Sequence, residues 1–277
     1  EIGSGLVGSE MCIRDRTNGL ESRNLLFNSL SVPFFVSERL DKTDGQDILF
    51  WQEPVGSEIP GNMQIILQDR SNRTRHIFVQ KSDAYEKLLA LGAPSEKLHK
   101  LGFIYQYERK NTFGKDVLIC TNSENVAHAH QITKALPQLH FHIAAITEMS
   151  TKLLTVGAYD NVTMYPCVKT SILDELFHKC DLYLDINHEG EIVSAVSRAF
   201  LNDQLIYAFK ETLHNTVYVA KEHIYAEDNV KELIAQLQRV TQDAAYMEQE
   251  LDVQKAGALA ETEEHFKEII ENTELLW

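Results

Sequence analysis

Short runs of hydrophobic residues alternate with amphipathic stretches along most of this chain. Runs of this length and composition are typical of strands buried on both faces. The stretches between them repeat hydrophobic residues at helical spacing, as expected for helices that cover such strands. The alternation predicts β-α-β units with right-handed crossovers and a mostly parallel sheet, which is the α/β fold class.

The pattern is clearest from Asp116 to the C-terminus. Strands are predicted over Asp116–Thr121, Leu139–Ala145, Asn161–Pro166, Asp181–Asn187, Gln204–Phe209 and Thr216–Ala220. Helices are predicted over 122–135, 148–154, 171–179, 191–200, 228–240 and 244–276. The first of these helices is expected to begin at Asn122 and Ser123, because both residue types are favoured N-caps.

The preceding part of the chain is less regular. Strands are predicted over Asp47–Gln52 and His76–Gln80, with a third apolar and aromatic run over Leu98–Tyr107. Short helices are predicted over Asn62–Gln68 and from Ser82 to a stop at Gly92. The charged segment 108–115 contains a glycine and suits an inter-domain linker. We therefore predict two domains, over 17–111 and 112–277, with the C-terminal helices in the second.

The first sixteen residues fit neither domain. Residues 1–16 have no hydrophobic period and no capping pattern, and they lack the basic start and apolar core of a signal peptide. The segment resembles a translated sequencing adapter, and a disordered native tail is the alternative. On the adapter interpretation the natural N-terminal part is missing, and residues 1–16 say nothing about the fold.

Composition restricts the class of function. Hydrophobic residues make up 44% of the 277 residues, which is enough for a sizeable core, and 24% are charged. The net charge of −15, with no run of Lys and Arg, argues against a nucleic-acid partner. No C-x-x-C pair occurs among the four cysteines, so a reducing compartment is favoured over a disulfide framework. No apolar run reaches the roughly 18 residues of a membrane span, so we expect a soluble chain that reaches a membrane only through a partner.

Candidate site residues lie in polar loops that follow the predicted strands. In an open parallel sheet, ligands bind beyond the carboxyl ends of the strands. The candidates in these loops are Asn122, Ser123, Glu148, His188, Glu189, Glu191, Lys210, His214 and Asn215. A helix beginning at Asn122 would offer backbone N–H groups to an anion. His188 and His214 are the better functional candidates, because a histidine buried at a strand end needs a polar partner.

Several of these residues also have a purely structural interpretation. Asn122, Ser123 and Glu148 are plausible helix caps, and Glu191 near a helix start favours the helix dipole. Two H-x-H pairs occur, at His128 with His130 and at His140 with His142. Residues two apart face each other on a strand but not on a helix, and neither pair has an evident third ligand. We predict no metal site, and no nucleotide-binding glycine motif outside the suspect tail indicates a cofactor.

Four stretches resemble a known family. LFWQEPVGSEIPGNMQIIL (Leu49–Leu67), LHFHIAAITEMSTKLL (Leu139–Leu154), DLYLDINHEGEIVSAVSRAF (Asp181–Phe200) and AFKETLHN (Ala208–Asn215) are similar to the GtfB-type stabilising subunit of the accessory-Sec O-GlcNAc transferase. The resemblance runs from about Asn24 to the C-terminus. It implies a GT-B-like fold of two Rossmann-type domains, with the first domain incomplete.

The resemblance also implies a role and a location. It implies a non-catalytic subunit that binds and stabilises a catalytic glycosyltransferase subunit and holds the acceptor protein. The donor, UDP-GlcNAc, would be used by the partner, and the acceptor would be the Ser/Thr residues of a serine-rich repeat adhesin. The family acts in the cytoplasm, peripherally at the cytoplasmic face of the membrane.

The residues themselves bear on whether this chain is an enzyme. Retaining GT-B enzymes commonly carry two glutamates eight residues apart after the fourth strand of this domain. Here Ser197 follows Glu189 by eight and Ala199 follows Glu191 by eight, so the second carboxylate is missing in both registers. The four polar strand-end loops carry one cation, Lys210, although a leaving diphosphate needs positive charge. We therefore expect no catalytic residues, and two alternatives stay open: an active GT-B enzyme that uses a UDP-sugar, and an unrelated doubly wound domain that binds a small ligand.

Overall fold

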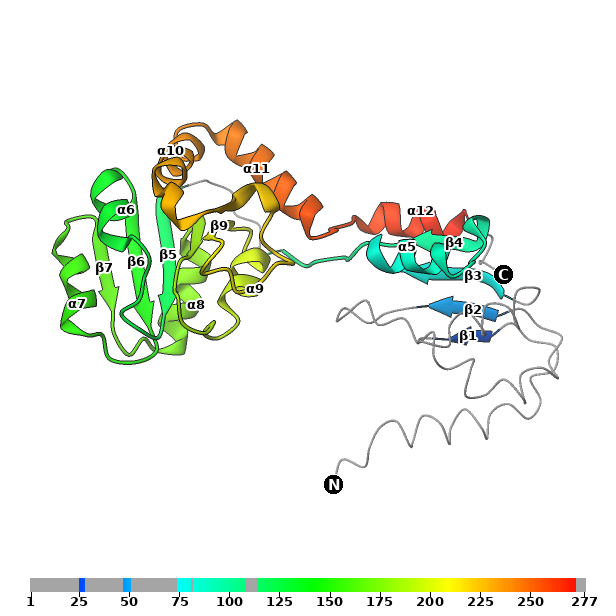
Figure 1. Cartoon of the computed structure of the whole chain (residues 1–277), viewed down its shortest axis with the longest axis horizontal. Helices are drawn as coiled ribbons and strands as arrows, with labels where there is room; N and C mark the ends of the chain where they lie inside the picture. Colours follow the sequence, from blue (N-terminus) through cyan, green and yellow to red (C-terminus); the bar gives the residue numbers. More distant parts are fainter. Residues whose placement is uncertain (1–24, 28–46, 51–73, 81, 108–113, 273–277) are drawn as a thin grey trace, which may run out of the picture. The chain divides into compact units, whose positions relative to one another are not determined.

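A computed structural model gives the structure of residues 25–27, 47–50, 74–80, 82–107 and 114–272 (Figure 1). The chain divides into two compact units, one formed by Glu1–Ile104 with Glu261–Trp277 (unit 1) and one by Tyr105–Ala260 (unit 2). This division joins the C-terminal segment to unit 1, whereas the sequence-based boundaries keep it in the second domain. The helix predicted over 62–68, the segment 1–16 and most of the expected linker lie outside the described residues.

Unit 1 contains a four-stranded parallel sheet with the order β1-β2-β3-β4. Its described elements are β1 (Leu25–Phe27), β2 (Asp47–Phe50), β3 (Thr74–Val79), α5 (Ser82–Ala90), η1 (Ser95–Lys97), β4 (Leu98–Lys100) and α12 (Glu263–Glu271). The strands and the helix predicted from Asp47, His76 and Ser82 are confirmed. Helix α5 ends at Ala90, and the turn after it contains Gly92, which has a φ of 95° that glycine adopts without a steric penalty.

Unit 2 contains a six-stranded parallel sheet with the order β10-β9-β8-β5-β6-β7. Its strands are β5 (Asp116–Thr121), β6 (His140–Ala145), β7 (Val162–Tyr165), β8 (Leu182–Asp185), β9 (Leu205–Phe209) and β10 (Ile224–Tyr225). Its helices are α6 (Ala129–Ala135), α7 (Thr151–Leu154), η2 (Thr155–Ala158), α8 (Thr170–Lys179), α9 (Ala195–Leu201), η3 (Lys221–His223), η4 (Glu227–Asn229), α10 (Val230–Val240) and α11 (Ala244–Gly257). This is the Rossmann strand order, whose direction reverses between β5 and β8. The predicted α/β class with parallel sheets is confirmed.

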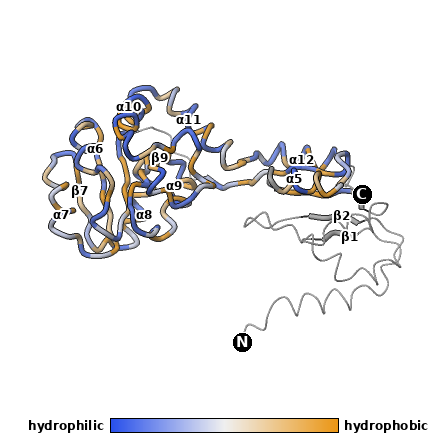
Figure 2. The backbone as a smooth tube through the Cα atoms, viewed as in Figure 1, coloured by the Kyte–Doolittle hydropathy of each residue, from blue (hydrophilic) through white to orange (hydrophobic). Residues whose placement is uncertain are grey.

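Helices cover both faces of the unit 2 sheet. Successive strand residues point to opposite faces, so Val117 and Leu118 belong to different hydrophobic cores. Residues of α6, α7, α10 and α11 join the Val117 core, whereas residues of α8 and α9 join the Leu118 core. In Figure 2 hydrophobic stretches run along the strands of this sheet, as strands buried on both faces require.

Helix α11 is fixed to the sheet by a buried amide. The side chain of Gln254 accepts a hydrogen bond from the Ile206 N–H at 2.8 Å and donates one to the Gln204 carbonyl at 2.8 Å. A neighbouring strand would offer the same donor and acceptor to this stretch, but β10 pairs only with Ala208 and Phe209. Gln254 therefore satisfies the edge of β9 where β10 does not reach.

Three predictions from the pattern are wrong. The helix expected from Asn122 begins at Ala129, because the intervening loop pairs with the end of β8 through a bridge between Val126 and Asn187. The strand expected over 216–220 is a series of turns, and the sheet ends instead with β10. The C-terminal helix is broken at Leu259, which has a φ of 55°. The other strands and helices predicted in unit 2 are present, with helix starts displaced by up to a turn.

Candidate functional site

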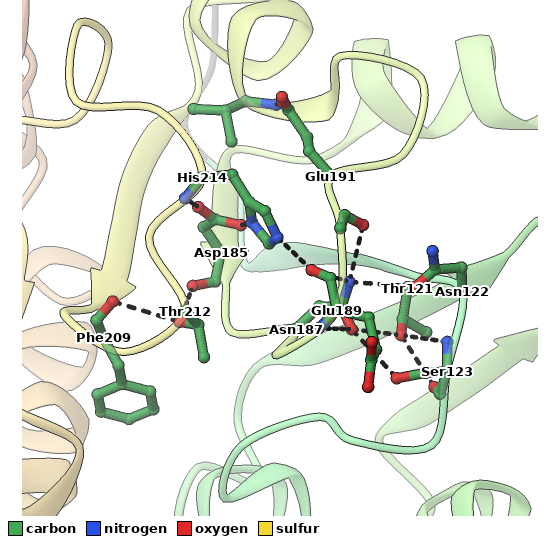
Figure 3. A network of polar contacts seen from close by, with 12 residues as sticks. Thr121, Asn122, Ser123, Asp185, Asn187, Glu189, Glu191, Phe209, Thr212 and His214 are labelled. Atoms are coloured by element: carbon green, nitrogen blue, oxygen red, sulfur yellow. Dashed lines mark hydrogen bonds and ion pairs between the residues drawn. The ribbon is translucent and has the colours of Figure 1, made fainter.

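The carboxyl ends of β5 and β8 lie side by side, and their polar loops meet there (Figure 3). The backbone joins them first: the Ala127 N–H donates to the Ile186 carbonyl at 2.8 Å and the His188 N–H to the Asn125 carbonyl at 3.0 Å. Both loops therefore form one continuous surface at the point where the strand order reverses.

Asn187 is the centre of this network. Its side-chain oxygen accepts hydrogen bonds from the hydroxyls of Thr121 at 3.1 Å and Ser123 at 3.3 Å. Its amide nitrogen donates to the carbonyls of Glu189 and Gly190, both at 3.3 Å. The same nitrogen donates to the side-chain oxygen of Asn122 at 3.4 Å. Asn187 is buried, so its hydrogen-bonding groups need partners inside the protein.

His214 joins the loop after β9 to the loop after β8. Its backbone N–H donates to Asp185 Oδ2 at 2.8 Å, and its ring Nδ1 lies 2.5 Å from Asp185 Oδ1. Its ring Nε2 contacts the Glu189 carbonyl oxygen. The Thr212 hydroxyl donates to the Asp185 carbonyl at 2.6 Å and strengthens the same connection.

The buried carboxylate controls the charge of His214. The hydrogen bond to Asp185 raises the pKa of His214 from 6.5 to about 9, against an opposing effect of burial. Only 1% of the Asp185 side chain is exposed, so solvent does little to stabilise its negative charge. The imidazolium therefore compensates a buried negative charge and does not remain available for an anionic ligand.

The two predicted glutamates have different surroundings. Glu189 Oε1 accepts a hydrogen bond from the Asn125 side chain at 3.1 Å and is exposed. Glu191 Oε1 accepts the backbone N–H of Val196 in the first turn of α9 at 2.9 Å. The structural interpretation of Glu191 as a helix-start residue is thus supported. Just before α9, Val193 and Ser194 have φ values of 46° and 52°, which are strained for non-glycine residues.

A pocket of about 450 Å³ opens at this edge of unit 2. Its lining comes from the segment 124–131, from Lys152, Leu153 and Val156, and from His188. On one side, His188 Nε2 and His128 Nε2 lie 3.4 and 3.6 Å from the two carboxylate oxygens of Glu227. On another side, Lys152 Nζ lies 3.8 Å from Glu124 Oε1. Lys152, the lysine of this lining, is thus paired with a carboxylate, which favours a neutral polar ligand over a strongly anionic one.

The remaining predicted residues, Glu148, Lys210 and Asn215, also follow strands, and the contacts at these positions are local. Glu148 is exposed after β6, and the helix cap there is Ser150, whose hydroxyl accepts the Leu153 N–H at 3.2 Å. Lys210 is exposed, and its backbone N–H donates to the Tyr225 carbonyl at 2.7 Å. Asn215 accepts the Val217 N–H at 2.8 Å, which is a turn contact.

Sequence reasoning did not single out Asp185, Asn187 or Glu227. Asp185 and Asn187 belong to a predicted buried strand, and a polar residue that ends such a strand is the signal that would have found them. Glu227 follows β10 in a charged stretch of ordinary appearance, and its two histidine neighbours come from other loops. Only the tertiary structure brings Glu227 to these two histidines.

Three further features, metal-ligand groups, cysteines and apolar helices, are described for the part of the chain that the structure covers. His140 and His142 share a face of β6 as predicted, with ring centroids 4.6 Å apart. Within the described ranges no group of three or more His, Cys, Asp or Glu side chains could hold a metal ion. Cys120, Cys167 and Cys180 are free thiols. Among the helices that the structure describes, none is long and apolar enough to cross a membrane.

The Rossmann-order sheet and its polar carboxyl edge define a doubly wound α/β domain of the Rossmann type, and comparisons with known proteins identify its family. Residues 117–254 match the family model of the GftB/GlyA-F C-terminal domain, and residues 16–91 match that of the GtfB third domain. The chain belongs to the GtfB family.

Two curated relatives are each named as the UDP-N-acetylglucosamine–peptide N-acetylglucosaminyltransferase stabilizing protein GtfB. The relative from Streptococcus agalactiae is 39% identical over 254 residues, covering 91% of this chain and 57% of the relative. The relative from Streptococcus gordonii is 40% identical over 237 residues, covering 85% of this chain and 53% of the relative. The chain thus spans a little over half the length of these relatives.

A solved structure gives the same result. The crystal structure of a GtfA/B complex bound to UDP and GlcNAc matches with a TM-score of 0.81 and 37% identity, over 96% of this chain and 60% of that chain. The predicted fold class, α/β with parallel sheets of GT-B type, is thereby confirmed. The predicted resemblance to the stabilising-protein family is confirmed as well.

Proposed function

We propose that this chain is part of a stabilising subunit that binds a catalytic O-GlcNAc transferase subunit and holds the acceptor protein, without transferring sugar itself. Membership of the GtfB family is the observation that carries the proposal, because the relatives are named stabilizing proteins of a peptide N-acetylglucosaminyltransferase. The solved GtfA/B complex supplies the class of partner, a GtfA-type glycosyltransferase subunit. The partner, and not this chain, would use UDP-GlcNAc.

The surface of unit 2 supports a non-catalytic role. Charge that develops on a nucleoside diphosphate leaving group needs cations aimed at it. Two cations near this edge have carboxylate partners instead: His214 binds Asp185, and Arg198 binds Asp174. Arg198 also lies over the Phe177 ring, with its guanidinium carbon 4.1 Å from the ring centroid.

The positions of the expected second carboxylate support the same conclusion. Ser197, eight residues after Glu189, is partly buried and donates its hydroxyl to the Ser194 carbonyl at 3.0 Å. Ala199, eight residues after Glu191, is fully buried in the core beneath α9. Neither position offers a carboxylate to a sugar, so the alternative of an active glycosyltransferase lacks a residue that such chemistry commonly uses.

The pocket beside His188 supports acceptor binding. Imidazoles, carboxylates and amides around it can both donate and accept hydrogen bonds, as hydroxyl groups require. Serine and threonine side chains of an acceptor polypeptide have this neutral character. We further propose that the acceptor is a serine-rich repeat adhesin modified in the cytoplasm before export by the accessory Sec system, with the complex peripheral to the membrane.

Calorimetric titration with UDP tests the proposal. We expect no detectable heat of binding when the protein, at the length of its relatives, is titrated alone. Binding should appear when the catalytic subunit is added. Micromolar affinity of the protein alone, about −8 kcal/mol, would indicate a preserved donor pocket and would favour the active-transferase alternative.

A further inference from the structure

The ring of His214 lies between two oxygen atoms that can only accept hydrogen bonds. Asp185 Oδ1 faces Nδ1 at 2.5 Å, and the Glu189 carbonyl oxygen faces Nε2. A neutral imidazole has a single N–H, so it can donate to one of these oxygens and not to both. The two contacts exist together only when both ring nitrogens carry a proton.

The two contacts differ in the cost of losing them. The Asp185 carboxylate is buried, and leaving it without its counter-charge is costly. The Glu189 carbonyl lies in an exposed loop and can exchange its partner for water. A neutral His214 would therefore keep its hydrogen bond to Asp185 and lose its hydrogen bond to the Glu189 carbonyl.

Releasing Glu189 affects the whole strand-end loop. The Glu189 carbonyl accepts hydrogen bonds from Asn187 and from His214, and the residue between Asn187 and Glu189 in the chain, His188, lines the pocket. His188 also reaches Glu227 at 3.4 Å. The position of this side of the pocket thus depends on a histidine that does not itself line the pocket.

We propose that His214 is a positioning residue, a link protonated at neutral pH that fixes the loop from Asn187 to Gly190 and so sets the side of the pocket carrying His188. The link acts on the geometry of the pocket through Glu189 and does not touch the ligand. A pocket with a fixed side costs less conformational entropy when it binds a flexible polypeptide. The inference rests on the geometry of unit 2 and holds whether or not the acceptor is the ligand.

The test combines the proton count of His214 with the order of the loop. Nitrogen-15 NMR of the imidazole in the full protein should show both ring nitrogens protonated at pH 7, with a titration near pH 9. Amide exchange protection of His188 and Glu189, corrected for intrinsic rates, should be constant up to about pH 8 and fall above it. In His214→Gln the protection should be at least tenfold lower at every pH.

Two controls separate the outcomes. His178→Gln removes an exposed histidine on α8 and should leave loop protection unchanged. If His214→Gln fails to fold, the titration of the unmodified protein decides alone. A neutral His214 at pH 7, or loop protection equal in His214→Gln and the unmodified protein, would overturn the proposal.

A peptide titration separates this proposal from the proposed function. We would measure the affinity of a synthetic serine- and threonine-rich peptide for the complex with the catalytic subunit. Weaker binding in His214→Gln, together with lost loop protection, supports both proposals. Lost protection with unchanged peptide affinity supports the positioning role and removes the pocket from acceptor binding.

Discussion

His214 and His142 of unit 2 both lie beside a carboxylate, yet their pKa values shift in opposite directions. His214 faces two oxygens that only accept, and its hydrogen bond to Asp185 raises its pKa to about 9. His142 lies 2.7 Å from Asp116 and 3.0 Å from the Tyr165 hydroxyl, which can donate to it. Burial lowers the pKa of His142 below 6.5, and Lys179 already lies 2.9 Å from the same Asp116 oxygen.

The difference shows what decides the charge of a buried histidine. A neutral His142 can donate from Nε2 to Asp116 and accept the Tyr165 hydroxyl at Nδ1, and Lys179 neutralises the carboxylate. Neither condition holds around His214. The neighbouring groups that donate or accept, and not the presence of an acid alone, set the protonation state.

Removal of the charged histidine should have the largest effect. His214→Ala leaves the buried Asp185 carboxylate without its cation and should lower the free energy of unfolding by about 3–5 kcal/mol. His142→Ala should cost less, about 1–3 kcal/mol, because Asp116 keeps Lys179. Urea unfolding of both variants gives the comparison. Equal losses would mean that the two sites do not differ as their contacts imply.

The pH dependence of stability should have two limbs. The folded pKa of His214 lies above 6.5, so its contribution is complete below pH 6.5 and is lost as pH rises toward about 9. The folded pKa of His142 lies below 6.5, so the folded state loses stability as pH falls below that value. His214→Gln should flatten the alkaline limb and His142→Gln part of the acid limb, as measured by urea unfolding across pH. A variant that flattens the opposite limb would contradict the assignment.

Asn187 offers an uncharged comparison at the same edge. Asn187→Ala leaves the hydroxyls of Thr121 and Ser123 without their shared acceptor and should cost about 1–3 kcal/mol. The effect should not vary with pH between 6 and 9, because no charge is removed. Thermal unfolding at several pH values measures this loss of stability. A loss that varies with pH would mean that Asn187 contributes to the pH dependence assigned to His214.

The smallest effect is expected at Lys179. Its side chain is 53% exposed, and exposed ion pairs contribute little. Lys179→Met should change the free energy of unfolding by less than about 1 kcal/mol and should bring the pKa of His142 upward, because a nearby positive charge is removed. Proton NMR of the His142 ring follows that pKa. A fall instead of a rise would show that Lys179 does not act on His142 by charge.

The sequence predicted the sheet better than the loops. Hydrophobic runs predict buried strands, and parallel topology places the carboxyl ends of all these strands at the same edge of the sheet. The start of α6 could not be predicted, because Val126 pairs with Asn187, a residue 61 positions away by their numbers. The prediction of a strand over 216–220 was wrong, because an alternating sequence pattern does not show whether a sheet edge is free to pair with another strand. Tyr218 instead packs against Phe200, with ring centroids 4.8 Å apart.

The sequence named the loops of the candidate site but not the contacts that its residues make. His188 and His214 were chosen because a buried histidine needs a partner. His214 is largely buried and has its partner in Asp185, whereas His188 is exposed and lies 3.4 Å from Glu227. The partners come from other loops and were invisible in the sequence. Glu191 could be a ligand or a helix-start residue on the sequence alone, and its bond to the Val196 N–H favours the second.

A transfer assay tests the proposed function most directly. The protein, at the length of its relatives, would be incubated with UDP-GlcNAc and a serine- and threonine-rich polypeptide, first alone and then with the catalytic subunit. We expect no transfer alone, full transfer with the partner, and no loss of the chemical step when His188 and Glu189 are replaced by Ala and Gln at saturating acceptor. Sugar transfer by the protein alone, abolished by those two substitutions, would contradict a non-catalytic role.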